Sequence, residues 1–592
     1  MTGRRATVVL SMVLSMGLAG LLSACGDGAS PDGPGDASSD AAAYCEGIRA
    51  RVDSFMADAP GPANRARPER YGGTAVVGGA GELSGGMNAL VSGLYESRQH
   101  QIFLNLMTLV QYDPELELRP YLAESWELSD DGRAVTFRIR DGIRWHDGEP
   151  TDAHDVAFTY RRATDPGTGF PNAAYWRYYE PGEAGIEVLD SLTVRFRMRP
   201  HAQPLSPWAN LAILPEHLLG DVPPEELRRH PFGTACPVGN GPFVFEEHNQ
   251  DESWSFVANP RFPEELGGRP HLDRYVLRII PEQTTLLTEL LTGGIDVYIR
   301  LRPDQAPRVE DADDLRLIAY PSREYSVVAW NARLPKLADP RVRRALTLGT
   351  DREEIVEAVL GGYGRVVNTS VLPYHWAYNP SISDVLSHDP GAARALLEEA
   401  GWTDRDGDGV RENAGGEPLE IVMDYSAADD IRQSVAEIMQ SHLAEVGVVI
   451  VPRALEGTTL IARLVTPTVD GRDFEAAVLS LSADFRLDDT PILHSESADD
   501  PMGFAGTDVP EIDRLLDTLL LVTDRDEARA HWRRYQDLLV EHQPYTFLFT
   551  RSFLNGVNRR IRDVRMDIRG EWGNVGEWWI PEEERIYVGS SR

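Results

Sequence analysis

The sequence reads ELRPYLAESWELSDDG over residues 117–132, VTFRIRDGIRWHDGEP over 135–150 and DVAFTY over 155–160. Over residues 135–140, apolar side chains alternate with polar ones, which is the period of a strand with one buried face. Ser129 to Gly132 supplies turn residues between this segment and the preceding one. The stretch therefore predicts a compact β-hairpin. A helix should follow, capped by Thr151, with Asp152 in its first turn, where the helix dipole favours a carboxylate.

Imidazole and carboxylate groups lie close together in this stretch, at His146, Asp147, His154 and Asp155. Such a group invites a metal site or acid–base catalysis, but nothing nearby supplies the three or four ligands that a metal site needs. Asp147 lies in a predicted turn, and His154 and Asp155 lie at a predicted helix start. Structural roles are therefore favoured, and no catalytic residue or metal ligand is predicted.

Four further blocks follow in chain order, and strand and helix patterns alternate along them, as in α/β proteins. They read PVGNGPF (237–243), IIPE with GGIDV (279–282 and 293–297), DPRVRRAL with DRE (339–346 and 351–353), and LLEEAGW (396–402). Thr350 with Glu353 predicts a capping box, and Asp389 before Pro390 predicts a second helix start.

Together with residues 117–160, these blocks resemble the signature of extracytoplasmic solute-binding protein family 5, the dipeptide, oligopeptide and nickel receptors that feed ABC importers. The similarity extends from about Gly73 to the C-terminus. It implies an α/β, bilobal, periplasmic-binding-protein-like fold of the large type II, cluster C kind, with an extra domain inserted in the first lobe. The implied boundaries are 70–105, 235–315 and 545–592 for lobe one, 106–234 for the inserted domain, and 316–544 for lobe two.

The segment SLSADF (480–485) resembles the one that, in peptide-binding members, places an aspartate against the α-ammonium of the bound peptide. Asp484 occupies that position, and a desolvated carboxylate can form a charge-assisted hydrogen bond to an ammonium. We therefore predict that Asp484 binds substrate, the alternative being a solvated loop residue. The tryptophan usual three residues earlier is Leu481 here, a departure that argues against di- and tripeptides in particular. Further substrate contacts are predicted at Trp330, Asn331, Trp376 and Tyr378.

The run Asp404 to Gly409, DRDGDG, has the opening spacing of an EF-hand calcium loop. Gly415 stands at the twelfth position, where the bidentate glutamate should be, while Glu412 and Glu417 are out of register. An acidic turn between a helix and the strand at 419–423 is therefore favoured, with calcium binding kept as the alternative.

The N-terminus has the pattern of a lipoprotein signal peptide. Arg4 and Arg5 precede an apolar run over 8–22, and LSAC (22–25) resembles the lipobox that is cut before Cys25. We predict a signal peptide over 1–24, lipidation of Cys25, a flexible tether over 25–43 and an N-terminal extension over 44–69. A transmembrane anchor is the alternative, but the run is shorter than the roughly 20 residues that span a bilayer.

Two cysteines remain, Cys45 and Cys236. In an oxidising compartment such a pair invites a disulfide, and two buried thiols are the alternative.

The charge and the lysine content of the chain exclude several classes of partner and motif. The 93 acidic and 58 basic residues give a formal charge of -35, which disfavours nucleic acids and anionic lipid surfaces as partners. The single lysine, Lys336, does not stand in a Walker A or S-x-x-K motif.

We therefore predict a monomeric receptor without a cofactor or bound metal, which captures peptides between its lobes and delivers them to an ABC permease and ATPase complex. It would be extracytoplasmic and held to the membrane by lipid. The first alternative keeps the fold but changes the cargo to a metal chelate, a sugar or another small solute, with His375 as the residue to watch. An extracellular enzyme is the second, although no common nucleophile or zinc motif is present.

Overall fold

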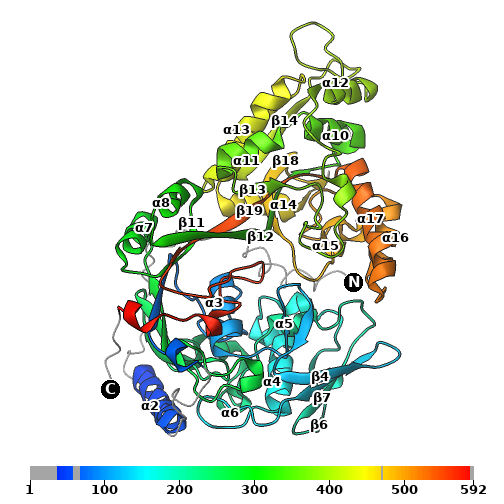
Figure 1. The fold of residues 1–592 in the computed structure, drawn as a ribbon. Coiled ribbons are helices and arrows are strands. Elements are labelled where there is room, and N and C mark those ends of the chain that lie inside the picture. Colours follow the sequence, from blue (N-terminus) through cyan, green and yellow to red (C-terminus); the bar gives the residue numbers. More distant parts are fainter. Residues whose placement is uncertain (1–35, 58–66, 469–470, 587–592) are drawn as a thin grey trace. The chain divides into compact units, whose positions relative to one another are not determined.

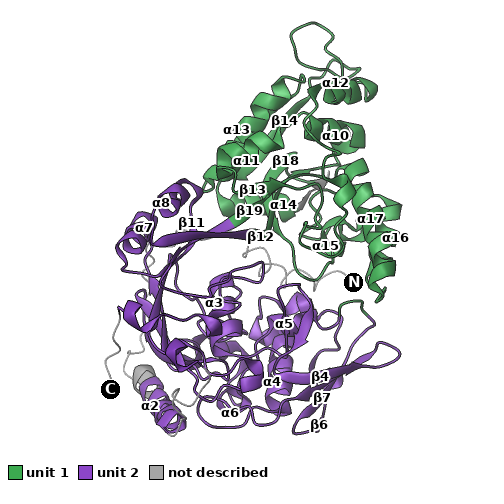
Figure 2. Cartoon of the chain, viewed as in Figure 1, with its two compact units in different colours: residues 1–18, 201–203, 321–552 green, residues 19–200, 204–320, 553–592 purple. Residues whose placement is uncertain are grey.

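The computed structural model describes residues 36–57, 67–468 and 471–586. The chain falls into two compact units (Figure 2). Among the described residues, unit 1 comprises 201–203 and 321–552, and unit 2 comprises 36–57, 67–200, 204–320 and 553–586. Two strands labelled in Figure 1, β12 (Leu315–Trp330) and β19 (Tyr545–Asn558), each pass from one unit into the other. The predicted lobe boundaries at 315/316 and 544/545 fall at the starts of these two strands.

Unit 1 is built on a mixed sheet with the strand order β15–β14–β18–β12–β19. The strands not yet bounded are β14 (Glu420–Ser426), β15 (Val449–Leu455) and β18 (Ala476–Ser482), and the short β13 (Gly364–Val366) pairs with β19. Strand β14 runs parallel to β15 and β18, whereas β12 runs antiparallel to β18. Helix α13 (Asp430–Ala444) makes the crossover that a parallel β14–β15 pair needs.

Helices cover both faces of this sheet. Val328 and Trp330 of β12 pack into one hydrophobic core with the first set of helices, while Val327 and Ala329 pack into a second core with the other set. Successive strand side chains point to opposite faces, so one strand feeds both cores. The first set is α10 (Pro340–Leu348), α11 (Arg352–Leu360), α12 (Pro390–Glu399) and α13; the second is α14 (Gly457–Val465), α16 (Pro510–Leu519) and α17 (Arg525–His542).

Unit 2 contains the strand order β19–β11–β1–β10–β9–β8. These strands are β1 (Thr74–Gly79), β8 (Phe243–Asn249), β9 (Ser253–Ala258), β10 (Arg274–Ile279) and β11 (Val297–Leu301). Helix α7 (Gln283–Thr292) connects β10 to β11, which both run parallel to β1. A Cβ atom on Gly78 would lie 2.5 Å from Ile295 Cδ1 and 2.7 Å from Leu286 Cδ2, so glycine lets α7 and the turn after it approach β1 closely.

The predicted hairpin is confirmed. Strands β4 (Ala123–Leu128) and β5 (Ala134–Ile139) pair antiparallel across a turn in which Gly132 has a φ of 66°. They form a four-stranded sheet, in the order β4–β5–β7–β6, with β6 (Ile186–Asp190) and β7 (Thr193–Arg197). Helix α4 (Ala153–Thr164) packs on this sheet, within the range predicted for the inserted domain.

Two predicted helix caps are wrong by one residue. Asp152, not Thr151, caps α4, because its carboxylate accepts from the His154 amide while Asp155 accepts from the Asp152 amide. Asp351, not Thr350, caps α11 by accepting from the Glu354 amide. The cap predicted before Pro390 is confirmed, since Asp389 accepts from the Ala392 amide.

Helix α2 (Asp36–Ala57) precedes the first strand. Residues 36–43 are therefore helical rather than part of a flexible tether, which agrees with the high helix propensity of Ala41, Ala42 and Ala43. The predicted signal peptide, Cys25 and the rest of the tether lie outside the described residues. None of the described helices is long and apolar enough to cross a bilayer.

Cys45 of α2 and Cys236 form a disulfide, with their Cα atoms 5.4 Å apart. Nearby, Ile48 is buried in the core of unit 2, and Arg51 Nη2 lies 3.1 Å from Asp147 Oδ2. Arg261 also donates to the Phe55 carbonyl oxygen, at 3.1 Å. Covalent, apolar and ionic contacts thus attach residues 45–55 of α2 to the rest of unit 2.

Replacing Cys45 by serine should lower the free energy of unfolding by about 2–4 kcal/mol, because the unfolded chain regains the freedom that this long-range cross-link removes. Urea unfolding without reductant measures the change. Cys236→Ser and the double variant should each lose the same amount as Cys45→Ser, since all three lack one and the same bond. A double variant that loses twice as much would show that the cysteines act separately.

Candidate functional site

Asp484 lies two residues beyond the end of β18, where the pairing of that strand with β12 stops. The residue is half-buried. Its Oδ1 accepts from the Phe485 amide at 2.7 Å, whereas Oδ2 is buried and has no hydrogen-bond partner among the described residues. A buried carboxylate oxygen without a donor is unfavourable, so this atom is suited to a donor that arrives with a ligand.

Tyr374 presents a second polar atom beside Asp484. Its hydroxyl is buried and makes no hydrogen bond to the described part of the chain. Burial raises the pKa of this tyrosine; the positive charge of Arg323 lowers it by a smaller amount and the charge of Asp484 raises it, so the hydroxyl keeps its proton. A primary ammonium has three N–H donors, so one that bonds to Asp484 Oδ2 keeps donors for other acceptors nearby. Sequence reasoning missed Tyr374, because 110 residues separate it from Asp484 along the chain.

His375 is fully engaged with the backbone. Nδ1 accepts from the Ala377 amide at 3.3 Å, so Nε2 carries the hydrogen and donates to the Phe485 carbonyl oxygen at 3.1 Å. Burial lowers the pKa of His375 to about 4, which keeps the ring neutral. A metal chelate would have to replace one of these hydrogen bonds. The ring fixes Phe485, and through it the loop that carries Asp484.

Trp376 and Tyr378 are partly buried and pack against the second core of unit 1. The guanidinium carbons of Arg525 and Arg529 lie 5.4 and 5.8 Å from the centroid of the Trp376 ring. Trp376 thus packs against this core and also makes cation–π contacts with two arginines.

Trp330 and Asn331 lie deeper, and both have fully buried side chains. The Trp330 indole donates to Thr546 Oγ1 at 3.0 Å, and the Asn331 amide donates to the Phe474 carbonyl oxygen at 2.9 Å. The structure thus brings Asp484 together with Tyr374 and His375, and places Trp330 and Asn331 in the interior of unit 1. Their predicted contact with substrate stays a prediction.

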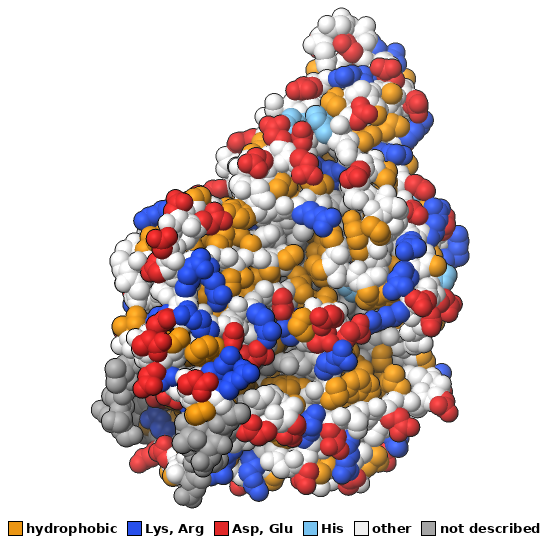
Figure 3. Space-filling view, in the orientation of Figure 1, with side chains coloured by type: hydrophobic (Ala, Val, Ile, Leu, Met, Phe, Trp, Pro, Cys, Tyr) orange, Lys and Arg blue, Asp and Glu red, His pale blue; other side chains and the backbone are white. Residues whose placement is uncertain are grey.

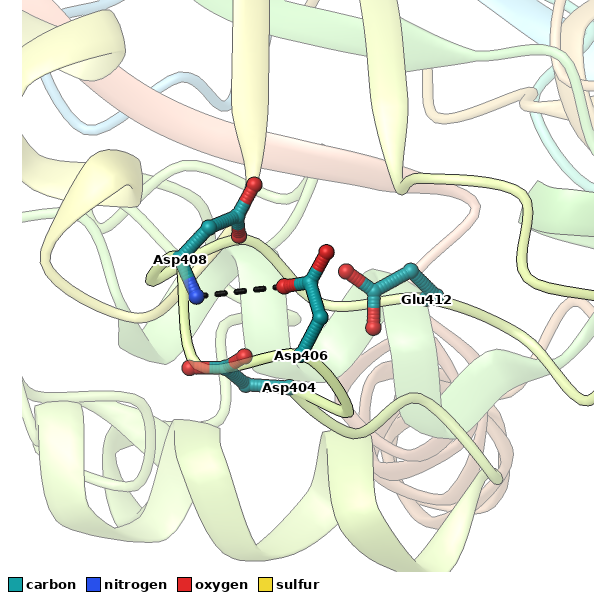
Figure 4. Close-up of side chains that lie close together, drawn as sticks. All are labelled: Asp404, Asp406, Asp408 and Glu412. Atoms are coloured by element: carbon teal, nitrogen blue, oxygen red, sulfur yellow. Dashed lines mark hydrogen bonds between the residues drawn. The ribbon is translucent and has the colours of Figure 1, made fainter.

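The acidic run after α12 brings four carboxylates together, from Asp404, Asp406, Asp408 and Glu412 (Figure 4). One oxygen from each lies within 4.8 Å of the others, so Glu412 joins the group although it is out of register for an EF-hand. Each carboxylate already accepts from a backbone amide of the same loop, as Glu412 does from Arg405 at 2.9 Å. Both the acidic turn and the calcium site stay open, and calorimetric titration with Ca²⁺ distinguishes them.

The residues around His146 have structural partners. His146 Nε2 donates to the Gly241 carbonyl oxygen at 3.0 Å, and Asp147 Oδ2 lies 3.0 Å from His217 Nε2. Asp155 accepts from the Trp145 indole at 2.9 Å and from the Glu216 amide at 2.8 Å. These bonds connect residues 145–155 to one another and to Gly241, Glu216 and His217, which is a structural role.

Comparison with known proteins supports the same fold. Residues 117–501 match the family described as bacterial extracellular solute-binding proteins, family 5 Middle. The oligopeptide-binding protein AppA of Bacillus subtilis (strain 168) is 27% identical over 518 residues, which cover 86% of this chain and 92% of AppA.

Two solved structures extend the likeness to three dimensions. The structure of B. subtilis AppA in complex with a nonapeptide matches with a TM-score of 0.69 at 26% identity, covering 86% of this chain and 99% of AppA. That of NikZ from Campylobacter jejuni in complex with Ni(L-His) matches with a TM-score of 0.68 at 24% identity, with the same coverage. These matches confirm the expected α/β, bilobal fold class.

The burial of His375 should make the free energy of unfolding depend on pH in the acid range. The pKa of His375 is about 4 in the folded protein and about 6.5 in an unfolded chain. Between pH 6.5 and pH 4 the unfolded state therefore binds more protons than the folded state, and the folded protein loses stability as the pH is lowered. From pH 7 to pH 4.5, the His375→Gln variant should lose about 2–3 kcal/mol less unfolding free energy than the parent protein. Urea unfolding at both pH values measures the difference, and equal losses would refute the assignment.

Proposed function

The chain belongs to the bacterial extracellular solute-binding proteins of family 5, and on that premise we propose that it is the substrate receptor of an ABC importer with peptides as its cargo. The similarity to B. subtilis AppA supports peptides as the cargo, since that relative is an oligopeptide-binding protein whose structure was solved in complex with a nonapeptide. The receptor releases its solute chemically unchanged to a permease and ATPase complex.

The observation that carries the proposal is the pair of buried polar atoms at Asp484 and Tyr374. The free amino terminus of a peptide supplies N–H donors for these two oxygens and a positive charge that pairs with Asp484. A hydrogen bond to a charged group contributes about 1.5–3 kcal/mol, enough to select a free ammonium over a blocked one. We propose that Trp376 and Tyr378 contact the peptide beside this group, while Trp330 and Asn331 hold the end of β12 from the interior.

Binding becomes a signal through the two strands that join the units. A peptide in a cleft between the lobes contacts both of them, which stabilises a closed arrangement over an open one. The permease then recognises the closed receptor. Each receptor acts as a monomer, because both lobes of the site belong to one chain.

The alternative cargo is a metal chelate or another small solute. The similarity to NikZ, which was solved in complex with Ni(L-His), supports this alternative. Native mass spectrometry of protein purified from its host separates the two. A heterogeneous set of co-purified peptides supports the peptide receptor, whereas one metal complex or saccharide replaces it with the second class.

The Asp484→Asn variant should bind peptides at least about tenfold more weakly, because the amide lacks the negative charge that pairs with the ammonium. Isothermal titration calorimetry with an unmodified oligopeptide measures the loss. N-acetylation of the same peptide should weaken binding to the parent protein to a similar extent, and should add little to the effect of Asp484→Asn.

Asp384→Asn is the matched control, since Asp384 is an exposed aspartate of the same unit. Its peptide affinity should equal that of the parent protein. Unchanged affinity in Asp484→Asn, or equal binding of the free and acetylated peptides, would remove Asp484 from the site.

We also propose that the mature protein is anchored outside the cytoplasm by lipid on Cys25. The support is the charged start, the apolar run over 8–22 and the sequence LSAC at 22–25. Two acyl chains give stable membrane attachment, because each buried methylene contributes about 0.8 kcal/mol.

Replacing Cys25 by serine should therefore move the protein from the membrane pellet to the soluble extracytoplasmic fraction of the host. Fractionation followed by immunoblotting measures the shift, and mass spectrometry of the parent protein should find the acyl groups on Cys25. A Cys25→Ser protein that stays in the pellet would point to the transmembrane-anchor alternative.

A further inference from the structure

Arg300 has an unusual backbone within β11. Its φ is 59°, in the left-handed region that side chains other than glycine rarely adopt, and the pairing of β11 with β19 shifts register between Tyr298 and Leu301. The Arg300 amide donates to Asn555 Oδ1 at 3.1 Å, which holds the irregularity in place. A β-bulge of this kind redirects a side chain out of the regular alternation of the strand. Strained backbone positions are frequent at functional sites, so the redirected Arg300 side chain is a candidate for a functional role.

The redirected guanidinium lies between two aromatic rings. Its central carbon is 4.3 Å from the centroid of Tyr95, in α3 (Tyr95–His100), and 4.3 Å from that of Phe553 in β19. Its Nη1 lies 3.1 Å from Glu96 Oε1, and its Nε lies 3.5 Å from Glu571 Oε1. Two cation–π contacts and two ion pairs fix the group from four sides.

The cluster carries more acid than base. Glu96 and Glu571 supply two negative charges and Arg300 supplies one positive charge, so the formal sum is -1. The Glu571 side chain is fully buried. Its Oε2 accepts from the Tyr95 hydroxyl at 3.1 Å, whereas its Oε1 has the Arg300 ion pair at 3.5 Å but makes no hydrogen bond in the described part of the protein. A buried carboxylate with an unused acceptor calls for a further donor.

Two members of the cluster are partly exposed. The Arg300 and Glu96 side chains are 29% and 33% exposed, whereas the Glu571 side chain is fully buried. Phe553 is the first residue of unit 2 on β19, and Tyr320, whose ring centroid lies 5.7 Å from that of Phe553, is the last on β12. The cluster thus lies where both connecting strands leave unit 2.

We propose that Glu96 and Glu571, spaced by Arg300, form a second binding subsite on unit 2 that takes a cationic group of the ligand, the ammonium or guanidinium of a basic side chain. Such a group brings donors for Glu571 Oε1 and Glu96, and it balances the excess negative charge of the cluster. An anionic group would add to that excess. Arg300 acts as a positioning residue, because its stacking between two rings fixes the distance between the two carboxylates.

This inference rests on the proposed peptide receptor and specifies its cargo as peptides that carry a basic side chain. The test uses calorimetric titration of the full-length protein with pentapeptides of alanine in which one position in turn is Lys, Gln or Glu. At one position the parent protein should prefer Lys to Gln by about tenfold. In Glu96→Gln that preference should fall below about threefold, with the affinity for the Gln peptide unchanged.

Glu246→Gln is the matched control. Glu246 also belongs to unit 2, is 38% exposed and lies 2.6 Å from an arginine, Arg274, at another place on the unit. This variant should keep the full preference for Lys. A parent protein that binds the Gln peptides but does not prefer Lys at any position, or a preference that survives in Glu96→Gln, would overturn the subsite while leaving the peptide receptor intact. A preference for Glu peptides would assign the cluster to an anion bound by Arg300. Failure of every pentapeptide to bind would refute the receptor proposal itself.

Discussion

Strands β12 and β19 run unbroken through both units, and the rest of the fold depends on their hydrogen bonds. They contain 16 and 14 residues, more than the roughly 3–10 residues that are usual for a strand in a globular protein. At about 3.3 Å per residue each extends roughly 50 Å. Neither unit can therefore form its sheet without fixing the path of a strand that the other unit also needs. This shared path ties the folding of two distant segments of sequence to one another.

Arginine carries much of the remaining polar structure in a chain with a single lysine. Arg343 is buried and donates to the carbonyl oxygens of Leu337, Ala338, His542 and Gln543. Burial lowers the pKa of Arg343 to about 10, which still leaves it charged near neutral pH. Its planar fork of five N–H donors suits backbone carbonyls at loop ends. Arg300 differs in kind, because its partners are carboxylates and aromatic rings. Acidic and basic side chains are interspersed over the face drawn in Figure 3, so gross charge on that face does not reveal either role.

Local signals in the sequence identified local structure. The hairpin at β4–β5 could be predicted because period-two alternation and turn residues are properties of neighbouring positions. The predictions for the helix caps at Asp152 and Asp351 were each wrong by one residue. Which residue caps a helix depends on which side-chain oxygen reaches the free amides of the first turn. Whether Cys45 and Cys236 form a disulfide could not be decided from the sequence, because no sequence pattern gives the distance between residues so far apart. Asp484 was found through a family resemblance, whereas Tyr374 and Arg300 belong to no motif and emerge from tertiary contacts and a backbone irregularity.

Both candidate subsites occur where regular pairing stops, Asp484 beyond the end of β18 and Arg300 at the bulge of β11. Inside a regular sheet the backbone groups satisfy one another, so unused acceptors gather at strand ends and irregularities. At both places the unused atom is a carboxylate oxygen. The net charge of -35 cannot supply this selectivity, because salt screens exposed charges beyond about 8–10 Å under physiological conditions. In the proposed binding mode, discrimination in favour of cationic groups therefore comes from these few desolvated oxygens, which act at contact distance.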